Sequence, residues 1–202
     1  LWARFDPREL ATEDAFRAHP QRVWDWYAER RQALAGVEPN AGHRALAAFQ
    51  ARYPGRMTLI TQNVDGLHQR AGSTVLALHG DLCTDRWLDD PKPCCNRRPP
   101  QPGRPPRCAT CGNWRRPAVV WFGEALPEAE LMAAEAAAES CDLMLVVGTS
   151  GEVYPAAGLV HQAHLAGSRV VIVNPEPSAL DGLADAQVRV RAAQCLPLLL
   201  ED

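Results

Sequence analysis

This sequence has almost no lysine, no long apolar segment and no excess of basic charge. Lys92 is the one lysine among 21 basic residues, a bias that the codon usage of a GC-rich genome explains. The longest aliphatic run, Leu143–Val147, has five residues, whereas a membrane-spanning helix needs about 20. The 21 Lys and Arg stand against 24 Asp and Glu, so the formal net charge is -3, and nucleic-acid-binding domains usually carry a basic face. We therefore expect neither a membrane protein nor a nucleic-acid-binding protein.

The first residues do not resemble a signal peptide, and the cysteine count is odd. Seven cysteines without a secretory signal do not fit a secreted disulfide scaffold. Reduced thiols or a metal site in the cytoplasm fit better. The 47% apolar and 22% charged residues are typical of a globular protein with a hydrophobic core. We therefore expect a cytoplasmic, globular protein.

Short apolar segments alternate with helical patterns along most of the chain. The first 38 residues have a helical pattern, and further helices are expected at 127–139 and 155–166. Segments of strand length and strand composition lie at 57–61, 74–78, 143–147, 170–173 and 188–190. Such alternation predicts an α/β fold, in which helices cover both faces of a parallel sheet.

Residues 81–117 interrupt this alternation. They hold five of the seven cysteines and many of the prolines without any hydrophobic periodicity, so we predict an insert that is held together by something other than a core. Cys108 and Cys111 form a CxxC knuckle, a spacing at which two thiolates can bind one zinc ion. Cys94 and Cys95 could complete the site, although adjacent cysteines do not easily act as a knuckle. A redox CxxC is the weaker alternative, because that motif normally opens a helix after a strand.

Polar residues follow four of the predicted strands. Gln62, Asn63 and Asp65 follow the first strand, and His79 follows the second. Two later strands end in Gly148-Thr149-Ser150 and Asn174-Pro175-Glu176. The carboxyl ends of parallel strands are where open α/β sheets bind ligands, and hydroxyls, glycine and an acid suit the phosphates and ribose of a nucleotide. The pattern predicts a nucleotide site at this edge of the sheet.

These motifs together resemble the sirtuin family, the NAD-dependent protein lysine deacylases. The resemblance covers almost the whole chain and is carried, in the family's order, by Thr61–Asp65, Leu78–Gly80, Arg116–Glu124, Val147–Ser150 and Val173–Asn174. The helix segment Tyr27–Arg30 further resembles the class III branch, which removes negatively charged acyl groups such as succinyl and malonyl. The resemblance implies a Rossmann-type parallel sheet with helices on both faces, a small helical module and a zinc-ribbon-like insert.

The resemblance also implies a role for each matching residue. His79 matches the catalytic base, which accepts a proton from a ribose hydroxyl and needs a pKa near the working pH. The segment Val119–Glu124 (Val119, Val120, Trp121, Phe122, Gly123 and Glu124) matches the one that pairs with a substrate peptide as an added strand. The zinc is structural, with Cys108 and Cys111 joined by Cys94 and Cys95. The positions that match NAD-binding residues are Gln62, Asn63, Val64, Asp65, Gly148, Thr149, Ser150, Asn174, Pro175, Glu176 and Ala192.

The reaction implied by the family transfers an acyl group from a protein lysine to NAD. Its products are nicotinamide, the free lysine and an O-acyl-ADP-ribose, and its partners are acylated-lysine proteins or peptides. Two alternatives share the fold: an NAD or ADP-ribose sensor without turnover, and a protein ADP-ribosyltransferase. His79 argues against a pure sensor, because binding alone needs no base. Tyr27 and Arg30 favour deacylation over ADP-ribosyl transfer.

Tyr27 and Arg30 also support a physical argument of their own. Residues three apart lie on one face of a helix, so a phenol and a guanidinium can converge on one point. A guanidinium forms a two-pronged pair with a carboxylate, which an acetyl group lacks. The competing interpretation is an exposed arginine beside Arg31 on a solvated helix face. In the family context we predict an acid-binding pocket.

The sequence departs from the family pattern in two places. Family members begin with a strand and a Gly-Ala-Gly-x-Ser turn, whereas this chain starts at Leu1-Trp2, so we expect it to be incomplete, with poor NAD affinity and little activity alone. Where the first metal-ligand pair of the family would fall, this chain has Trp87 and Asp90, so either the first ligand pair has shifted, or zinc binds weakly or not at all. Asp90, through a carboxylate oxygen, and Cys83 are further candidate ligands. The expected division is a helical part of a small domain (1–38), a first core segment (39–80), a zinc module (81–117) and a second core segment (118–202).

Overall fold

The computed structural model describes residues 7–201, so Leu1 and Trp2 lie outside the described residues. Within this part the chain divides into two compact units. The first unit contains the chain up to Val37, then Asn63–Gly66 and His79–Leu126. The second contains Glu38–Gln62, Leu67–Leu78 and the chain from Pro127 onward. The segment 118–126, which we expected in the core, thus groups with the insert and the N-terminal helices.

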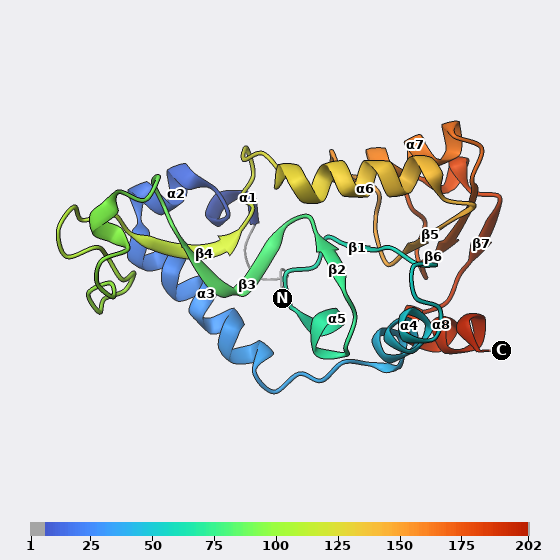
Figure 1. Ribbon diagram of the computed structural model, residues 1–202, viewed down its shortest axis with the longest axis horizontal. Helices are drawn as coiled ribbons and strands as arrows, with labels where there is room; N and C mark the ends of the chain where they lie inside the picture. The colour runs from blue at the N-terminus through green and yellow to red at the C-terminus, as the bar shows by residue number, and fades with distance from the viewer. Residues whose placement is uncertain (1–6, 202) are drawn as a thin grey trace. The chain divides into compact units, whose positions relative to one another are not determined.

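The second unit is the α/β core. Strands β1 (Leu59–Thr61) and β2 (Val75–Ala77) pair in parallel, and β5 (Leu143–Val147), β6 (Arg169–Val173) and β7 (Ala186–Val188) form a parallel sheet in that order. Figure 1 shows helices α6 (Glu128–Ser140) and α7 (Gly158–Leu165) on one side of these strands, and α4 (Ala41–Arg52) and α8 (Ala192–Leu200) on the other. The short helices α5 (Leu67–Arg70) and η2 (Asp181–Leu183) complete it. The predicted α/β fold with parallel strands is confirmed.

Strand β6 is largely buried and its neighbour β5 partly buried, because their side chains are mostly aliphatic. Val146, Val170 and Ile172 pack with Val160 of α7 and with Leu180, all under 7% exposed. One of the helices that cover them, α4, begins at a clear capping signal. Asn40 caps α4 by accepting a hydrogen bond from the backbone of His43, whose side chain accepts one from the backbone of Asn40 in return.

The first unit packs helices on an antiparallel pair of strands. Its helices are α1 (Pro7–Leu10), α2 (Glu13–Ala18), which Thr12 caps, and α3 (Pro20–Leu34). Strands β3 (Gly80–Trp87) and β4 (Arg115–Val119) pair so that Gly80 lies opposite Val119 and Trp87 opposite Arg115. Phe16 of α2 is fully buried against Trp114 and Trp121, with ring centroids 6.1 and 5.3 Å away.

Strands β3 and β4 correct the expectation of a patternless segment at 81–117. Both ends of that segment are strands, and the loop between them contains the 3-10 turn η1 (Pro93–Cys95). The strands escaped detection because their side chains are mostly charged or polar, so no apolar alternation marks them. Among the described residues, no helix is both long and apolar enough to cross a membrane.

Candidate functional site

His79 lies at a junction of three predicted segments of the first unit. Its carbonyl accepts a hydrogen bond from the backbone of Val120 at 2.9 Å, and the carbonyl of Val64 accepts one from Leu82 at 2.8 Å. Gly80 has φ of 80°, and a Cβ there would lie 2.0 Å from the carbonyl oxygen of Ala118. Only glycine therefore permits this close crossing. It brings segment 63–65, the histidine and the start of segment 119–124 together.

Tyr27 and Arg30 both lie on the buried face of α3. Tyr27 is 2% exposed and Arg30 is 8% exposed, so the alternative of a solvated Arg30 is wrong. The guanidinium of Arg30 lies 3.3 Å over the Trp26 ring and donates to the Trp26 carbonyl at 2.9 Å. Burial lowers the pKa of Arg30, and burial raises the pKa of Tyr27 to about 12. At neutral pH the pair is thus a neutral phenol beside a poorly solvated positive charge.

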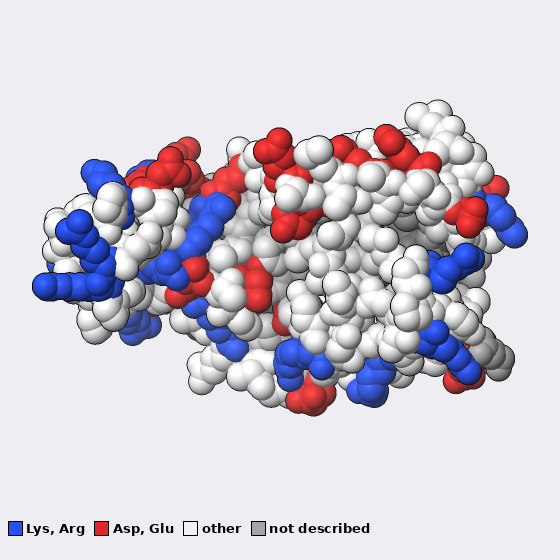
Figure 2. Space-filling model, in the orientation of Figure 1, with Lys and Arg blue, Asp and Glu red and all other residues white. Residues whose placement is uncertain are grey.

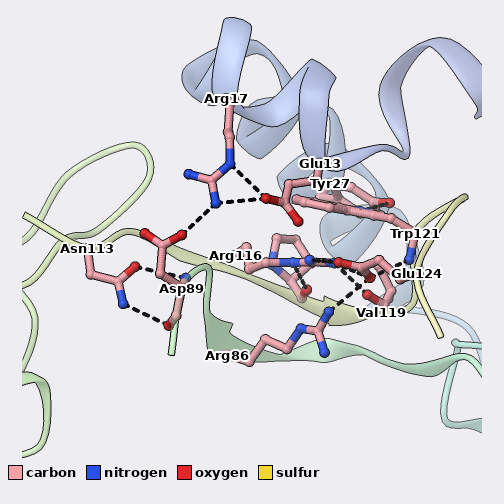
Figure 3. Close-up of polar contacts among 11 residues, drawn as sticks. Glu13, Arg17, Tyr27, Arg86, Asp89, Asn113, Arg116, Val119, Trp121 and Glu124 are labelled. Carbon is pink, nitrogen blue, oxygen red and sulfur yellow. Dashed lines mark hydrogen bonds and ion pairs between the residues drawn. The ribbon is translucent and has the colours of Figure 1, made fainter. Parts of the chain in front are cut away.

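A buried ion pair holds the segment that contains Trp121. The side chain of Arg116 is 1% exposed, pairs with Glu124, and donates to the carbonyl of Val119 at 2.7 Å. Glu124 also accepts from Arg86 at 2.9 Å and from the backbone of Trp121 at 2.8 Å (Figure 3). The indole of Trp121 lies under the Arg116 guanidinium, 3.2 Å from ring centroid to Cζ. The carboxylate of Glu124 therefore holds segment 119–124 in place through bonds within the first unit.

Trp121 connects this ion pair to the predicted acid pocket. It is 2% exposed, and its Nε1 donates a hydrogen bond to the Tyr27 hydroxyl at 2.9 Å (Figure 3). Arg116 is the first residue of the motif Arg116–Glu124, but neither it nor Arg86 was predicted to be a site residue. An arginine does not by itself mark a site in this chain, because arginines occur throughout it. The pairing of Arg116 with Glu124, eight residues later, is visible only in the folded chain.

The backbone of segment 119–124 is already largely engaged within the chain. The N–H groups of Val120 and Phe122 donate to the carbonyls of His79 and Ala11, each at 2.9 Å. Those of Trp121 and Glu124 donate to the Glu124 side chain and the Trp121 carbonyl. A peptide that adds as a strand here must therefore use the carbonyl groups of the segment or exchange these bonds.

Replacing Glu124 with glutamine is expected to destabilise the protein by about 3 kcal/mol, because it leaves the buried guanidinium of Arg116 without its counter-ion. Burial alone would raise the pKa of Glu124, but hydrogen bonds from Arg116 and Trp121 outweigh it and lower the pKa. The stability that the ionised Glu124 contributes is therefore fully present above the ordinary glutamate pKa of 4.5. It is lost as the pH falls through the lowered pKa of Glu124 in the folded protein. Denaturant unfolding of the unmodified protein and of Glu124→Gln, measured from pH 7 to acidic pH, should show that their difference in unfolding free energy shrinks below pH 4.5.

Glu13→Gln is the matched control for this substitution. Glu13 pairs with Arg17 at 2.7 Å, but both side chains are 44% exposed (Figure 3). A pair this exposed contributes between zero and about 1 kcal/mol. Equal losses from the two substitutions would contradict the role that we assign to Glu124.

Two polar loops meet at the end of the sheet in the second unit. Gly148 follows β5 with φ of 64°, and the loop after β6 begins at Asn174. The Asn174 amide donates to the carbonyl of Thr149 at 3.4 Å, and the Ser178 hydroxyl donates to that of Ser150 at 3.1 Å. The structure thus brings 148–150 and 174–176 together as expected of neighbouring parallel strands. Gln62 follows β1, and Ala192 is the first residue of α8.

Four cysteines of the insert form a cluster. The ligand atoms of Cys94, Cys95, Cys108 and Cys111 all lie within 4.8 Å of one another, and the sulfurs of Cys95 and Cys111 are 3.5 Å apart. Tetrahedral zinc with Zn–S bonds of 2.3 Å requires sulfurs about 3.8 Å apart, so the cluster fits that ion. The adjacent cysteines can both contribute because they lie in the tight turn η1, in which Cys95 donates to the Lys92 carbonyl at 2.8 Å.

The thiols of this cluster differ in acidity. Hydrogen bonds from the backbone of Cys111 and Thr110 lower the pKa of Cys108 to about 6, while the Cys111 side chain raises the pKa of Cys94 to about 11. One thiolate thus forms readily, and its charge opposes ionisation of the next. A bound dication reverses that opposition and favours all the thiolates. Cys83 and Asp90, the other candidate ligands, lie outside the cluster.

Removing a cysteine ligand is expected to remove the metal and loosen the insert. Cys108→Ser should contain no zinc after purification, whereas the unmodified chain should contain one ion. Its insert should become sensitive to protease, because little apolar core holds that segment. Cys83→Ser is the matched control, since Cys83 is exposed and outside the cluster. Metal content that falls equally in both variants would count against this site.

The parallel α/β core, the polar loops after β5 and β6 and the four-cysteine cluster are together typical of a nucleotide-binding enzyme with a structural metal module. The sequence pattern of the Sir2 family matches residues 1–155, and the chain belongs to that family. An NAD-dependent protein deacylase of Ralstonia nicotianae is 56% identical over an alignment 203 residues long, which covers 99% of this chain and 80% of the relative. One of Mycobacterium tuberculosis is 49% identical over an alignment 207 residues long, which covers 100% of this chain and 86% of the relative.

Solved structures agree with this assignment. A complex of a Sir2 homolog with NAD has a TM-score of 0.85 and 38% identity, and the match covers 99% of this chain and 78% of that one. A Sir2 protein bound to an acetylated peptide has a TM-score of 0.84 and 28% identity, with 95% and 82% covered. The resemblance to sirtuins that the motifs indicated is therefore confirmed.

Proposed function

We propose that this chain, an NAD-dependent protein deacylase of the Sir2 family, prefers lysine acyl groups that end in a carboxylate, succinyl and malonyl, over acetyl. The observation that carries the proposal is the pair of Tyr27 and Arg30 on the buried face of α3. A guanidinium attracts a carboxylate more strongly on a buried face than in water. An acyl group that ends in a carboxylate would gain from this attraction, and an acetyl group would not.

The guanidinium of Arg30 provides the charge in this pocket. Its planar donors match a carboxylate in two parallel hydrogen bonds. The aromatic ring of Trp26 beneath it, 3.3 Å away, fixes the plane in which those donors lie. Burial, which lowers the pKa of Arg30, also removes the water that would otherwise screen the pair.

The hydroxyl of Tyr27 provides a second donor. Indole Nε1 can only donate, so the hydrogen bond from Trp121 makes the Tyr27 oxygen an acceptor on that side. The phenol proton is then available for another acceptor, such as a carboxylate oxygen. Because the pKa of Tyr27 is about 12, this proton is present at every physiological pH.

We propose that NAD binds at the strand ends and that His79 is the general base. When bound, NAD supplies the ADP-ribose that receives the acyl group. His79 would accept the proton of a ribose hydroxyl, and Asn63, Val64 and Asp65 would surround the nicotinamide side together with Gln62. The adenosine half would lie against Gly148, Thr149, Ser150, Asn174, Pro175, Glu176 and Ala192. The substrate peptide would lie along Val119–Glu124.

A cytoplasmic location belongs to the same proposal. All seven cysteines are free thiols, and a four-thiolate metal site needs a compartment that keeps thiols reduced. Cell fractionation with an antibody against the chain tests it, and recovery outside the cytoplasmic fraction would contradict it.

The test measures NAD-dependent release of nicotinamide from matched succinyl-lysine and acetyl-lysine peptides. It is run on this chain and on a form with a longer N-terminus. A higher kcat/KM for the succinyl peptide supports the proposal, and an equal or lower value overturns the acyl preference while leaving the deacylase activity intact. NAD binding without turnover of either peptide would favour a sensor instead.

A further inference from the structure

Charge is distributed very unevenly along this chain. Residues 91–123 contain seven of the 21 Lys and Arg but none of the 24 Asp and Glu. The rest of the chain therefore has a large excess of acidic residues. The net charge of -3 for the whole chain thus combines a basic segment with an acidic remainder. Such an asymmetry indicates an interaction with an anionic partner more directly than the overall charge does.

Four of these cations, Lys92, Arg97, Arg98 and Arg107, belong to the insert, and we call them together the basic tip. All four are exposed, and Figure 2 shows basic side chains crowded over the end of the insert. Within residues 7–201, no carboxylate lies within 4.0 Å of any of these four side chains. The tip therefore presents positive charge that the described part of the chain does not neutralise.

The loop that carries the tip is stiff. Eight of the 17 prolines lie between residues 91 and 117, and each fixes a backbone angle. The cysteine cluster closes the loop, and the backbones of Gln101 and Arg107 exchange hydrogen bonds of 2.8 and 3.2 Å. Arg104 pairs with Asp25 of α3 at 2.8 Å, which fastens the loop to the helix. Preorganised charges lose little conformational entropy when a partner binds.

We propose that the basic tip is a docking surface for an acidic segment of the protein substrate, on the same unit as segment 119–124. This rests on the proposed action on protein lysines. Arginine pairs with Asp and Glu carboxylates in bidentate fashion, so a run of acidic residues near the acyl-lysine would be held by the tip while the segment holds the lysine. Substrate selection would then depend on charge beyond the acyl group.

The surroundings of the tip favour an acidic protein over a nucleic acid. No aromatic residue occurs between Trp87 and Trp114, so the tip offers no ring on which a base could stack. Its one helical element, η1, has three residues and cannot read a groove. Positive charge is therefore the feature by which the tip can recognise a partner, and recognition by charge suits a flexible acidic peptide.

The test uses two acetyl-lysine peptides that differ in a flanking run of five glutamates or five glutamines. Acetyl-lysine is used so that the result does not depend on the acyl preference. Fluorescence anisotropy measures peptide binding, and nicotinamide release measures turnover. We expect the glutamate peptide to bind about tenfold more tightly at low salt, because several exposed pairs each contribute a little. The KM should fall with kcat unchanged, and the advantage should vanish at high salt.

Two charge-reversed variants separate the tip from net charge. Arg97→Glu with Arg98→Glu should remove the preference for the glutamate peptide and leave the glutamine peptide unaffected. Arg56→Glu with Arg169→Glu changes the net charge equally at exposed positions of the other unit and should retain the preference. Equal binding of the two peptides, or equal loss in both variants, overturns the proposal. The proposal is also overturned if a DNA oligonucleotide displaces the bound glutamate peptide from the tip at a lower concentration than free glutamate peptide does.

Failure of this proposal is distinguishable from failure of the proposed function. A chain that turns over the glutamine peptide but ignores the glutamates is a deacylase without a docking tip. A chain that binds the glutamate peptide and turns over neither retains the docking surface and loses the proposed activity.

Discussion

Replacing His79 with alanine is expected to lower turnover of both succinyl-lysine and acetyl-lysine peptides by about 10²- to 10⁴-fold, the usual contribution of a general base. Both rates fall because proton removal from the ribose hydroxyl does not depend on the acyl group. The fold should survive, since the His79 carbonyl that accepts a hydrogen bond from Val120 at 2.9 Å is present in alanine too. Steady-state nicotinamide release measures the effect.

His164→Ala is the matched control for this prediction. His164 is exposed on α7, so its loss should leave turnover unchanged. NAD affinity, measured by calorimetry, should be similar in all three proteins, because the base acts on the proton and does not hold the nucleotide. Turnover by His79→Ala within about threefold of the unmodified chain would show that another group is the base.

The features that could be predicted from sequence are those that residue type and order alone determine. Aliphatic strands separated by helices led to the parallel sheet. Glycines and polar residues after each strand led to the loops 148–150 and 174–176, which the structure brings together. These signals are local, because a parallel strand buried on both faces must be apolar wherever it lies.

The features that escaped prediction depend on pairing between distant or oddly spaced residues. Glu124 was expected to face the substrate as part of its motif, yet its carboxylate accepts hydrogen bonds from Arg116, Arg86 and Trp121. Nothing in the sequence marks Arg116, among 20 arginines, as the one whose side chain is 1% exposed. The adjacent cysteines Cys94 and Cys95 were predicted as metal ligands, and the structure places both in the four-cysteine cluster; the turn η1 that lets both sulfurs face one point could not be read from the sequence.

Replacing Arg30 with methionine is expected to lower kcat/KM for the succinyl peptide by about 30- to 100-fold while changing that for the acetyl peptide by less than about threefold. Methionine retains the length and apolar contacts over the Trp26 ring but removes the charge. Charge-assisted hydrogen bonds to a carboxylate contribute about 1.5–3 kcal/mol each, which is the size of the selective loss. The acetyl group makes no such bonds, so it loses nothing comparable.

Arg31→Met is the neighbouring control. Arg31 donates to the Leu82 carbonyl and pairs with Asp85, each at 2.6 Å, so it joins α3 to β3 and should matter for stability alone. Its substitution should lower the thermal midpoint and leave the ratio of succinyl to acetyl turnover unchanged. If Arg30→Met lowered both rates equally, its role would be structural, and the acid pocket would be wrong.

Trp121→Phe tests whether the direction of the Tyr27 hydroxyl matters as much as the charge of Arg30. Phenylalanine removes the Nε1 donor that holds the Tyr27 oxygen at 2.9 Å but retains a ring beneath Arg116. The phenol can then rotate, so the succinyl preference should fall several-fold. In a Tyr27→Phe background the same substitution should have no further effect on the preference, because the hydroxyl that it orients is gone. Additive losses would mean that Trp121 shapes the pocket independently of Tyr27.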